Sequence, residues 1–233
     1  MHTGSSLKRQ ENHHCLGRRQ RLKARFLSAP DSLADYELLE SFLFLSLPRA
    51  DTKPLAKELL KHFHSLGGVL GAGPEKLGAL KGMCPHAVYA VKLVESLLHR
   101  LLKEKLSRVS LLDNMDRVVR YCRATMAQLK VEQFRVFFLD SKGSLLADEC
   151  QQKGTVDHTA LYPREIMKRA LALDAASLVV AHNHPSGYAT PSKADKDVTQ
   201  HLRRLSHEMG LRLIDHIIIG KYEWYSFKAQ GLL

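Results

Sequence analysis

Two histidines one residue apart are the side chains of this sequence best placed to do chemistry. His182 and His184 lie in "VVAHNHPSG", after a run of β-branched and small apolar residues. Side chains alternate along a strand, so both imidazoles point to the same side and can converge on one ion. Ser192 and Asp195 follow a Pro- and Gly-containing turn, where a helix is expected to start. From the first turn of that helix, the carboxylate of Asp195 can reach back toward the two rings.

This donor set indicates a zinc site. His182 and His184 supply two nitrogens and Asp195 one oxygen, and zinc with three protein ligands keeps its fourth position for water. The ion lowers the pKa of that water from 15.7 to about 7, which supplies hydroxide at neutral pH. A second explanation stays open, because Ser192 three residues before Asp195 is also a capping box that only holds the helix.

The spacing H-x-H-x7-S-x-x-D resembles the JAMM motif of zinc metallohydrolases. The string "HNHPSGYATPSKAD", with "GTV", "PRE", "DHIIIG" and "YSF" around it, is similar to the bacterial RadC branch of that group. The resemblance implies that His182, His184 and Asp195 are zinc ligands. It also implies that Ser192 hydrogen-bonds a tetrahedral oxyanion and that an upstream Glu accepts the proton of the water. Upstream, "DYELLESFLFLSLPRADTKPLAKELL" is similar to the helical N-terminal part of RadC proteins.

The Glu that fits the upstream position is Glu132 in "KVEQFRVFFLD", directly before a strand-like run. A carboxylate there can act as general base from across the sheet. Glu149 and Glu165 are the alternatives. His216 in "DHIIIG" alternates with apolar residues, which is typical of a structural histidine; whether it or the adjacent Asp215 contacts the metal ligands is left open.

The elements that must position these residues indicate an α/β fold of the α+β type. From residue 115 the pattern predicts a helix, two strands joined at "SKG", a further strand at "QQKGTV" and a helix opened by Pro163. A buried strand ending at the histidines, a helix ending at Gly210 and two last strands follow. We therefore expect residues 115–233 to form a JAMM/MPN-like metal-binding domain, a mixed sheet flanked by helices.

Residues 31–105 show apolar side chains at three- and four-residue spacing and predict a compact helical domain, followed by a linker over 106–114. We expect Ser32 to cap its first helix and Gly67-Gly68 to follow the end of its second. "LGALKGMCPHAVYAVKL" resembles a helix-hairpin-helix, whose glycine turn presents backbone N–H groups to a phosphate. Cys84 stands in place of the second glycine of that turn, so a structural and a DNA-contacting role both stay open.

The charge of the chain is strongly positive, at +11 over 233 residues. A positive field attracts polyanions such as nucleic acid. Residues 1–30 read as a basic arm that contacts phosphates or is merely solvated, because they gather Lys8, Arg9, Arg18, Arg19, Arg21, Lys23 and Arg25 against Glu11.

No apolar run reaches the roughly 20 residues that span a bilayer, and the first residues lack the apolar core of a signal peptide. These features predict a cytoplasmic protein without a membrane partner. The scattered Cys15, Cys84, Cys122 and Cys150 predict reduced thiols. The sequence carries no oligomerisation signal.

Two functions remain after these observations. The first is a zinc-dependent hydrolase that attacks peptide or isopeptide bonds, which the RadC resemblance links to DNA repair. The second is a nucleic-acid-associated accessory protein, in which the basic arm and the helical domain bind DNA and the metal site is structural or inactive. The sequence does not identify the substrate.

Overall fold

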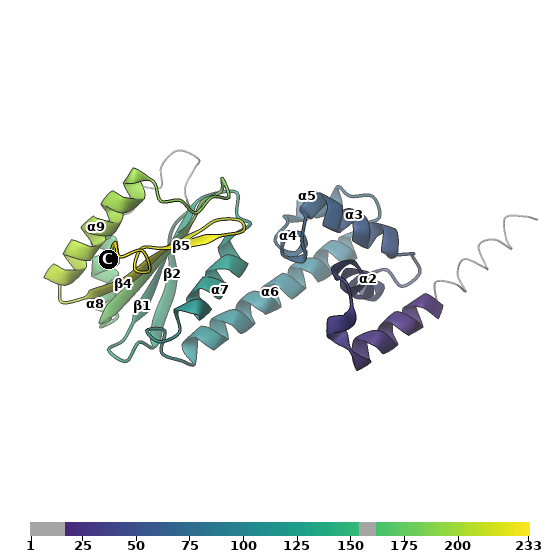
Figure 1. Ribbon diagram of the computed structural model, residues 1–233, viewed down its shortest axis with the longest axis horizontal. Helices are drawn as coiled ribbons and strands as arrows, with labels where there is room; N and C mark the ends of the chain where they lie inside the picture. The colour runs from purple at the N-terminus through teal and green to yellow at the C-terminus, as the bar shows by residue number, and fades with distance from the viewer. Residues whose placement is uncertain (1–16, 154–161) are drawn as a thin grey trace, which may run out of the picture. The chain divides into compact units, whose positions relative to one another are not determined.

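The computed structural model describes residues 17–153 and 162–233, and the chain divides into two compact units, residues 1–96 and 97–233. The described residues of the first unit are helical, whereas the second combines a five-stranded sheet with helices (Figure 1). The α+β class is therefore confirmed. Within the described ranges, no helix combines the length and the apolar character needed to cross a membrane.

The first unit is built from short helices around one apolar core that contains Leu43, Leu59 and Leu77. Its described elements are a helix over 17–28, the 3-10 helix η1 (Pro30–Ser32), α2 (Asp35–Ser46), α3 (Lys53–Phe63), α4 (Leu66–Leu70), α5 (Pro74–Gly78) and the start of α6 (Pro85–Ser107).

Two predicted helix ends differ from the structure. Ala34, not Ser32, is the N-cap of α2, because the chain makes a 3-10 turn before the helix begins. Helix α3 ends at Phe63, and its C-cap His64 adopts a left-handed φ of 70°. Both glycines predicted to follow α3 lie inside α4.

The part of the predicted basic arm that the structure describes is a helix bound to its own unit. Arg18 makes two hydrogen bonds of 2.7 Å to the carboxylate of Glu40 on α2, and Arg25 pairs with Glu37. Arg19 donates to backbone carbonyls after α2, including that of Leu47. These three arginines are therefore engaged within the chain. Residues 1–16 of the predicted arm lie outside the described residues.

The predicted hairpin joins α5 to α6. Gly82 has a φ of +97°, which favours glycine, and Met83 is buried in the core of the first unit. Cys84 is half-buried and packs against the same core. These contacts give the hairpin a packing role.

The second unit carries all strands of the described chain. Its elements are α7 (Met115–Met126), β1 (Gln133–Leu139), β2 (Leu145–Lys153), α8 (Pro163–Ala172), β3 (Ser177–Asn183), α9 (Lys193–Glu208), β4 (Arg212–Ile219) and β5 (Trp224–Ser226). The sheet order is β2-β1-β3-β4-β5, in which β3 and β4 are parallel and the other pairs antiparallel. Helix α9 connects the two parallel strands. The predicted strand at "QQKGTV" is the end of β2 as far as Lys153, and its remaining residues lie outside the described ones.

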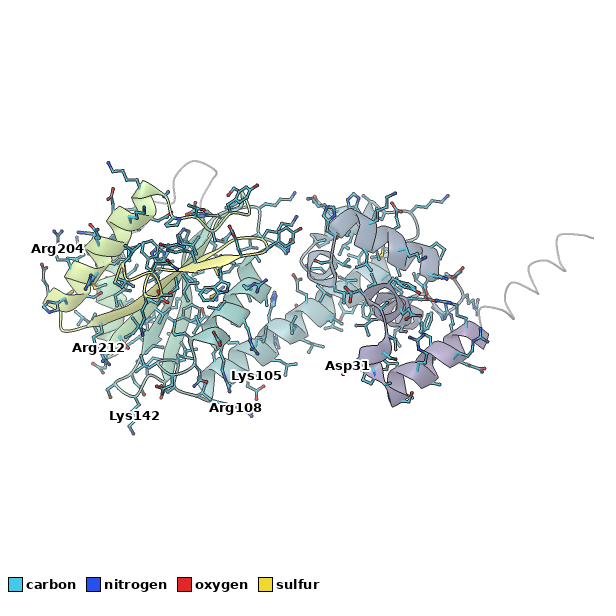
Figure 2. All side chains as sticks on the ribbon, in the orientation of Figure 1. Asp31, Lys105, Arg108, Lys142, Arg204 and Arg212 are labelled. Atoms are coloured by element: carbon cyan, nitrogen blue, oxygen red, sulfur yellow. The ribbon has the colours of Figure 1, made fainter. Side chains whose placement is uncertain are left out.

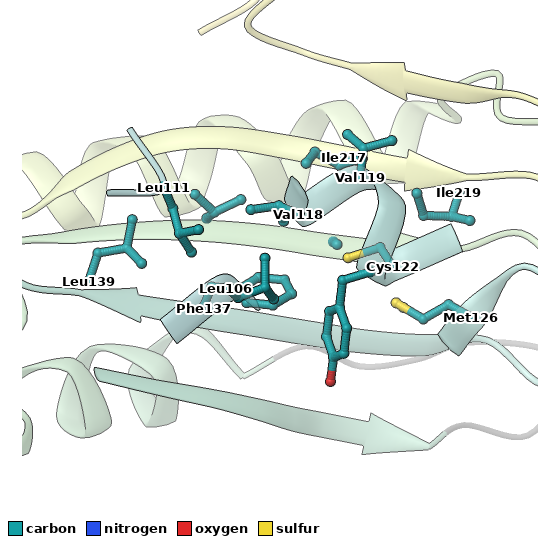
Figure 3. Packing of buried hydrophobic residues seen from close by; sticks show 13 residues of the cluster. Leu106, Leu111, Val118, Val119, Cys122, Met126, Phe137, Leu139, Ile217 and Ile219 are labelled. Atoms are coloured by element: carbon teal, nitrogen blue, oxygen red, sulfur yellow. The ribbon is translucent and has the colours of Figure 1, made fainter. Parts of the chain in front are cut away.

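The sheet is buried on both faces. Phe134, Val136 and Val180 pack under α8 and α9, and the opposite face packs against α7 and the last turns of α6. Figure 3 shows the apolar cluster on this α7 side of the sheet. Leu106 and Leu111 are fully buried in it, so the segment predicted as a linker contributes to the core of the second unit.

Candidate metal centre

Strand β3 places both histidines at the carboxyl end of the parallel strand pair, the usual position of ligand sites in open α/β sheets. His182 is 1% exposed, and its ring stacks on Phe134 of the neighbouring β1, with ring centroids 5.9 Å apart. His184 follows the last residue of β3, and its backbone N–H donates to the carbonyl of Ile219 at 2.9 Å. Contacts with β1 and β4 therefore help to position the two histidines.

The atoms that could bind a metal lie close together. The Nε2 atoms of His182 and His184 are 3.0 Å apart. His182 Nε2 lies 3.1 Å from Asp195 Oδ1, and His184 Nε2 lies 3.4 Å from Asp195 Oδ2. A tetrahedral zinc ion with ligand bonds of about 2.0–2.1 Å holds its ligand atoms about 3.3 Å apart. The spacing and the chemistry of the three donors fit such an ion, and in the described ranges no other three-residue group of this kind occurs.

Asp195 is held by the start of helix α9. Ser192 is the N-cap: its Oγ accepts from the Asp195 N–H at 3.1 Å and donates to Asp195 Oδ2 at 2.7 Å. The Ser192 N–H also donates to Oδ2, at 2.7 Å. The capping box is thus formed, and the capped carboxylate still faces the two histidines.

The electrostatics of the site favour a charged carboxylate. Burial raises the pKa of Asp195, but hydrogen bonds from His182, His184 and Ser192 and the charge of His182 outweigh it, so the pKa lies well below its ordinary value. The hydrogen bond to Asp195 in turn raises the pKa of His184, against the opposite effect of burial. A cation entering the site therefore meets an ionised carboxylate.

The outer nitrogen of His184 has a fixed proton. Its Nδ1 lies 2.8 Å from the carbonyl oxygen of Tyr188, and a carbonyl can only accept, so Nδ1–H is the donor. In the neutral ring the lone pair is then on Nε2, the atom that faces Asp195.

A longer chain of hydrogen bonds sets the same tautomer in His182. The Thr199 hydroxyl donates to the backbone carbonyl of Asp195, so it accepts from Nδ1–H of His216. Burial between Phe134 and Phe227 lowers the pKa of His216 well below its ordinary value, and the ring is neutral. His216 Nε2 therefore accepts from Nδ1–H of His182 at 2.8 Å, which leaves the lone pair of His182 on Nε2.

Of the two residues that the sequence left open beside the ligands, His216 makes the contact. Asp215 instead accepts from the Ser226 hydroxyl at 2.6 Å and from the Lys228 N–H at 3.0 Å. The role of Thr199 was not predicted from the sequence. The available signal was its position four residues after Asp195, which places the two side chains on one face of the same helix.

Glu132 lies directly before β1 and outside the three-ligand cluster. Its charge contributes to the raised pKa of His184, which places the carboxylate within electrostatic reach of that ring. The buried Asn183 holds both neighbours of Glu132: its Oδ1 accepts from the Gln133 N–H at 2.9 Å, and its Nδ2 donates to the Val131 carbonyl at 3.2 Å. The residue between the two histidines thus connects Glu132 to β3.

The two alternative carboxylates have other surroundings. Glu149 on β2 accepts from Arg169 at 2.9 and 2.7 Å, and β1 separates its strand from β3. Glu165 is exposed in the first turn of α8. The role of Asn183 was not predicted from the sequence. The available signal was a polar residue on the face of β3 that packs against α7.

The fold and the site together define an α+β domain with three candidate metal ligands beside the end of a parallel strand. Residues 112–232 match the RadC-like JAB domain family, and the chain belongs to this family of RadC proteins. JAB domains typically bind a metal, in agreement with the donor set.

Two curated relatives extend the similarity beyond that domain. A UPF0758 protein from Ruegeria pomeroyi is 46% identical over 216 residues, which cover 92% of this chain and 96% of the relative. A UPF0758 protein from Rhodobacter capsulatus is 47% identical over 213 residues, which cover 91% of this chain and 100% of the relative. Neither name states an activity.

Proposed function

We propose that the protein is a cytoplasmic zinc-dependent hydrolase that cleaves amide bonds, of the peptide or isopeptide kind. The observation that carries the proposal is the triangle formed by His182 Nε2, His184 Nε2 and the Asp195 carboxylate. The two nitrogens are 3.0 Å apart, Oδ1 lies 3.1 Å from His182 Nε2, and Oδ2 lies 3.4 Å from His184 Nε2. The hydrogen bonds at both Nδ1 atoms direct the lone pairs of the two rings into that triangle.

The residues of the chain divide the work in the proposed reaction. His182, His184 and Asp195 hold zinc, which with three protein ligands supplies an acidified water and polarises a carbonyl. Glu132 accepts the proton of the attacking water and passes it to the leaving nitrogen, as a positioned general base and acid does. The Ser192 hydroxyl, which donates to Asp195 Oδ2 in the structure, turns in the proposed reaction to donate to the oxygen that becomes negative in the tetrahedral intermediate.

Metal analysis of the purified protein tests the site before a substrate is known. We expect close to one zinc per chain in the wild type and a loss of most of it in His182→Ala and Asp195→Ala. Removal of a single ligand from a three-ligand site leaves the ion without a complete protein shell. A wild type that binds no zinc from a buffered zinc solution contradicts the proposal.

The general base is tested on fluorogenic peptide and isopeptide-linked substrates. We expect Glu132→Gln to keep its zinc and to lose at least about 100-fold in turnover, the typical contribution of general base catalysis. Glu165→Gln is the matched control and keeps wild-type turnover. Equal rates for Glu132→Gln and the wild type remove Glu132 from the mechanism.

A further inference from the structure

A basic groove lies on the second unit, away from the candidate metal centre. Its volume is about 860 Å3, and it runs between α9, the start of β4 and the segment after β5. Four exposed cationic side chains line it, and Glu208 is the one acidic side chain among the lining residues. These cations are Arg203, Arg204, Arg212 and Lys228. Arg204 and Arg212 lie at the same end of this unit (Figure 2).

None of the four cations forms an ion pair with a carboxylate of residues 17–153 or 162–233. Arg204 lies 3.1 Å from the ring of His201. Lys228 has a counter-charge in Asp215: burial raises the pKa of that carboxyl, and the charge of Lys228 acts against the rise. Arg135 and Arg169 of the same unit, by contrast, are paired with Asp148 and Glu149. Arg203, Arg204 and Arg212 thus bring like charge together from α9 and β4 without an ion pair in the described residues, and such charges repel one another.

Helix electrostatics explain only part of the arrangement. Arg203 and Arg204 lie near the C-terminal end of α9, where the helix dipole favours positive charge. Arg212 begins a strand, and Lys228 follows the last strand, so no helix end favours a cation there. These two side chains add charge to the groove for a reason outside the helix.

We propose that the basic groove binds the phosphodiester backbone of a nucleic acid, a function beyond the proposed hydrolysis. A backbone places a negative charge at regular short intervals and enters a concave path bordered by cations. The lining residues offer no Phe, Tyr or Trp on which bases could stack, so the cations contact the phosphates, and we expect binding with little dependence on base sequence.

The groove and the metal centre are separable. Arg204 follows Asp195 by nine residues on α9 (204 − 195), which is about 13 Å along the helix axis. A change in the groove therefore leaves the three candidate ligands in place, and zinc content reports on the fold of the variants.

Binding of the full-length protein to a fluorescently labelled 20-base-pair duplex of mixed sequence, followed by anisotropy at several salt concentrations, tests the proposal. We expect the triple variant Arg203→Ala, Arg212→Ala and Lys228→Ala to bind at least tenfold more weakly at low salt. The slope of log affinity against log salt falls by about 0.9 for each phosphate that the protein no longer neutralises, so by nearly 3 in the triple variant. Arg212→Ala alone lowers it by about 0.9, which keeps the test valid if the triple variant does not fold.

The matched control removes the same charge elsewhere on the unit. Arg120→Ala, Arg123→Ala and Lys142→Ala affect exposed cations of α7 and of the β1–β2 turn, and we expect affinity within twofold of the wild type. Equal weakening in both triple variants would assign binding to the overall charge of the protein and would overturn the proposal that the groove binds the duplex. The same holds if the wild type binds phosphatidylserine vesicles through these residues but not the duplex, or prefers one duplex sequence strongly.

Discussion

At the scale of single residues, the hydrogen bonds on the outer side of the metal centre determine which nitrogens are free. Thr199 and His216 never touch the position of a cation, yet their bonds leave Nε2 of His182 unprotonated. Partners of this kind orient a ligand ring and raise its basicity. The two residues are therefore positioning residues whose effect is measurable as metal affinity.

We predict that Thr199→Val weakens zinc binding about 10- to 100-fold, the usual effect of losing such a partner. Valine keeps the shape of threonine but leaves Nδ1–H of the buried His216 without an acceptor. The zinc dissociation constant, measured by competition with a chelating dye, checks this, and nitrogen NMR of the imidazoles reports the tautomers. Thr199→Ser keeps the hydroxyl and should retain wild-type affinity. Identical affinities for valine and threonine contradict the inferred chain of bonds.

We predict that Asn183→Ala lowers the free energy of unfolding by about 2–3 kcal/mol, because a buried N–H on Gln133 and a carbonyl on Val131 lose their partner. Urea denaturation of the zinc-free protein measures the change. Asn114→Ala removes one bond, to the Ser110 carbonyl, from a less buried side chain and should cost under about 1 kcal/mol. Equal losses in the two variants would show that the two Asn183 bonds contribute no more to stability than the single Asn114 bond.

At the scale of elements, the turn after His184 is fixed by backbone contacts between two loops. The Lys221 N–H donates to the Gly187 carbonyl at 2.8 Å, and Gly187 has a φ of +95°. A Cβ added at Gly220 would lie 2.4 Å from that carbonyl oxygen, so only glycine fits beside the turn. The loop after β4 therefore helps to hold the turn that carries His184.

We predict that Gly220→Ala destabilises the protein by about 1–3 kcal/mol, the usual cost of forced overpacking, and reduces zinc affinity because the turn after His184 must shift. Thermal unfolding and zinc titration measure the two effects. At Gly78, the last residue of α5, nothing lies within 4 Å of an added Cβ, so Gly78→Ala should be neutral or slightly stabilising. A stable, zinc-binding Gly220→Ala would contradict the proposed role of the loop.

The elements around the candidate site follow from local sequence patterns. The β-branched run before His182, the Ser192 cap and Gly210 after α9 each carry their own signal, and the structure has β3 and α9 at those places. The ties between distant segments have no such signal. The bond from Asn183 to Gln133 joins residues 50 apart, and it depends on the register of β1 against β3.

The predicted linker shows the same limit at a domain boundary. Polar residues such as Ser107, Arg108 and Ser110 surround its leucines, and composition alone favours an exposed connection. Leu106 and Leu111 are nevertheless fully buried because α7 and the sheet leave an apolar face that the end of α6 and the segment after it cover. That apolar face exists only in the packed sheet, so the sequence of the linker alone does not predict the burial of its leucines.

At the scale of the whole molecule, the core of the second unit begins before the segment that the family match covers. That match starts at residue 112, whereas the second unit starts at residue 97 and includes Leu106 and Leu111. A fragment over 97–233 keeps both leucines, and a fragment over 112–233 exposes the apolar surface that they cover. Two such side chains contribute about 1.5–3 kcal/mol each when fully buried.

We predict that the fragment 97–233 folds and binds zinc, and that the fragment 112–233 is less stable by at least about 3 kcal/mol, because it lacks the two leucines. Urea denaturation gives the free energies, and zinc content shows whether the metal centre forms in each. The double variant Leu106→Ala and Leu111→Ala in the longer fragment separates side-chain packing from chain length and should lose most of the same stability. Equal stability of the two fragments would place the boundary of the metal-binding unit at residue 112 and remove the end of α6 from its core.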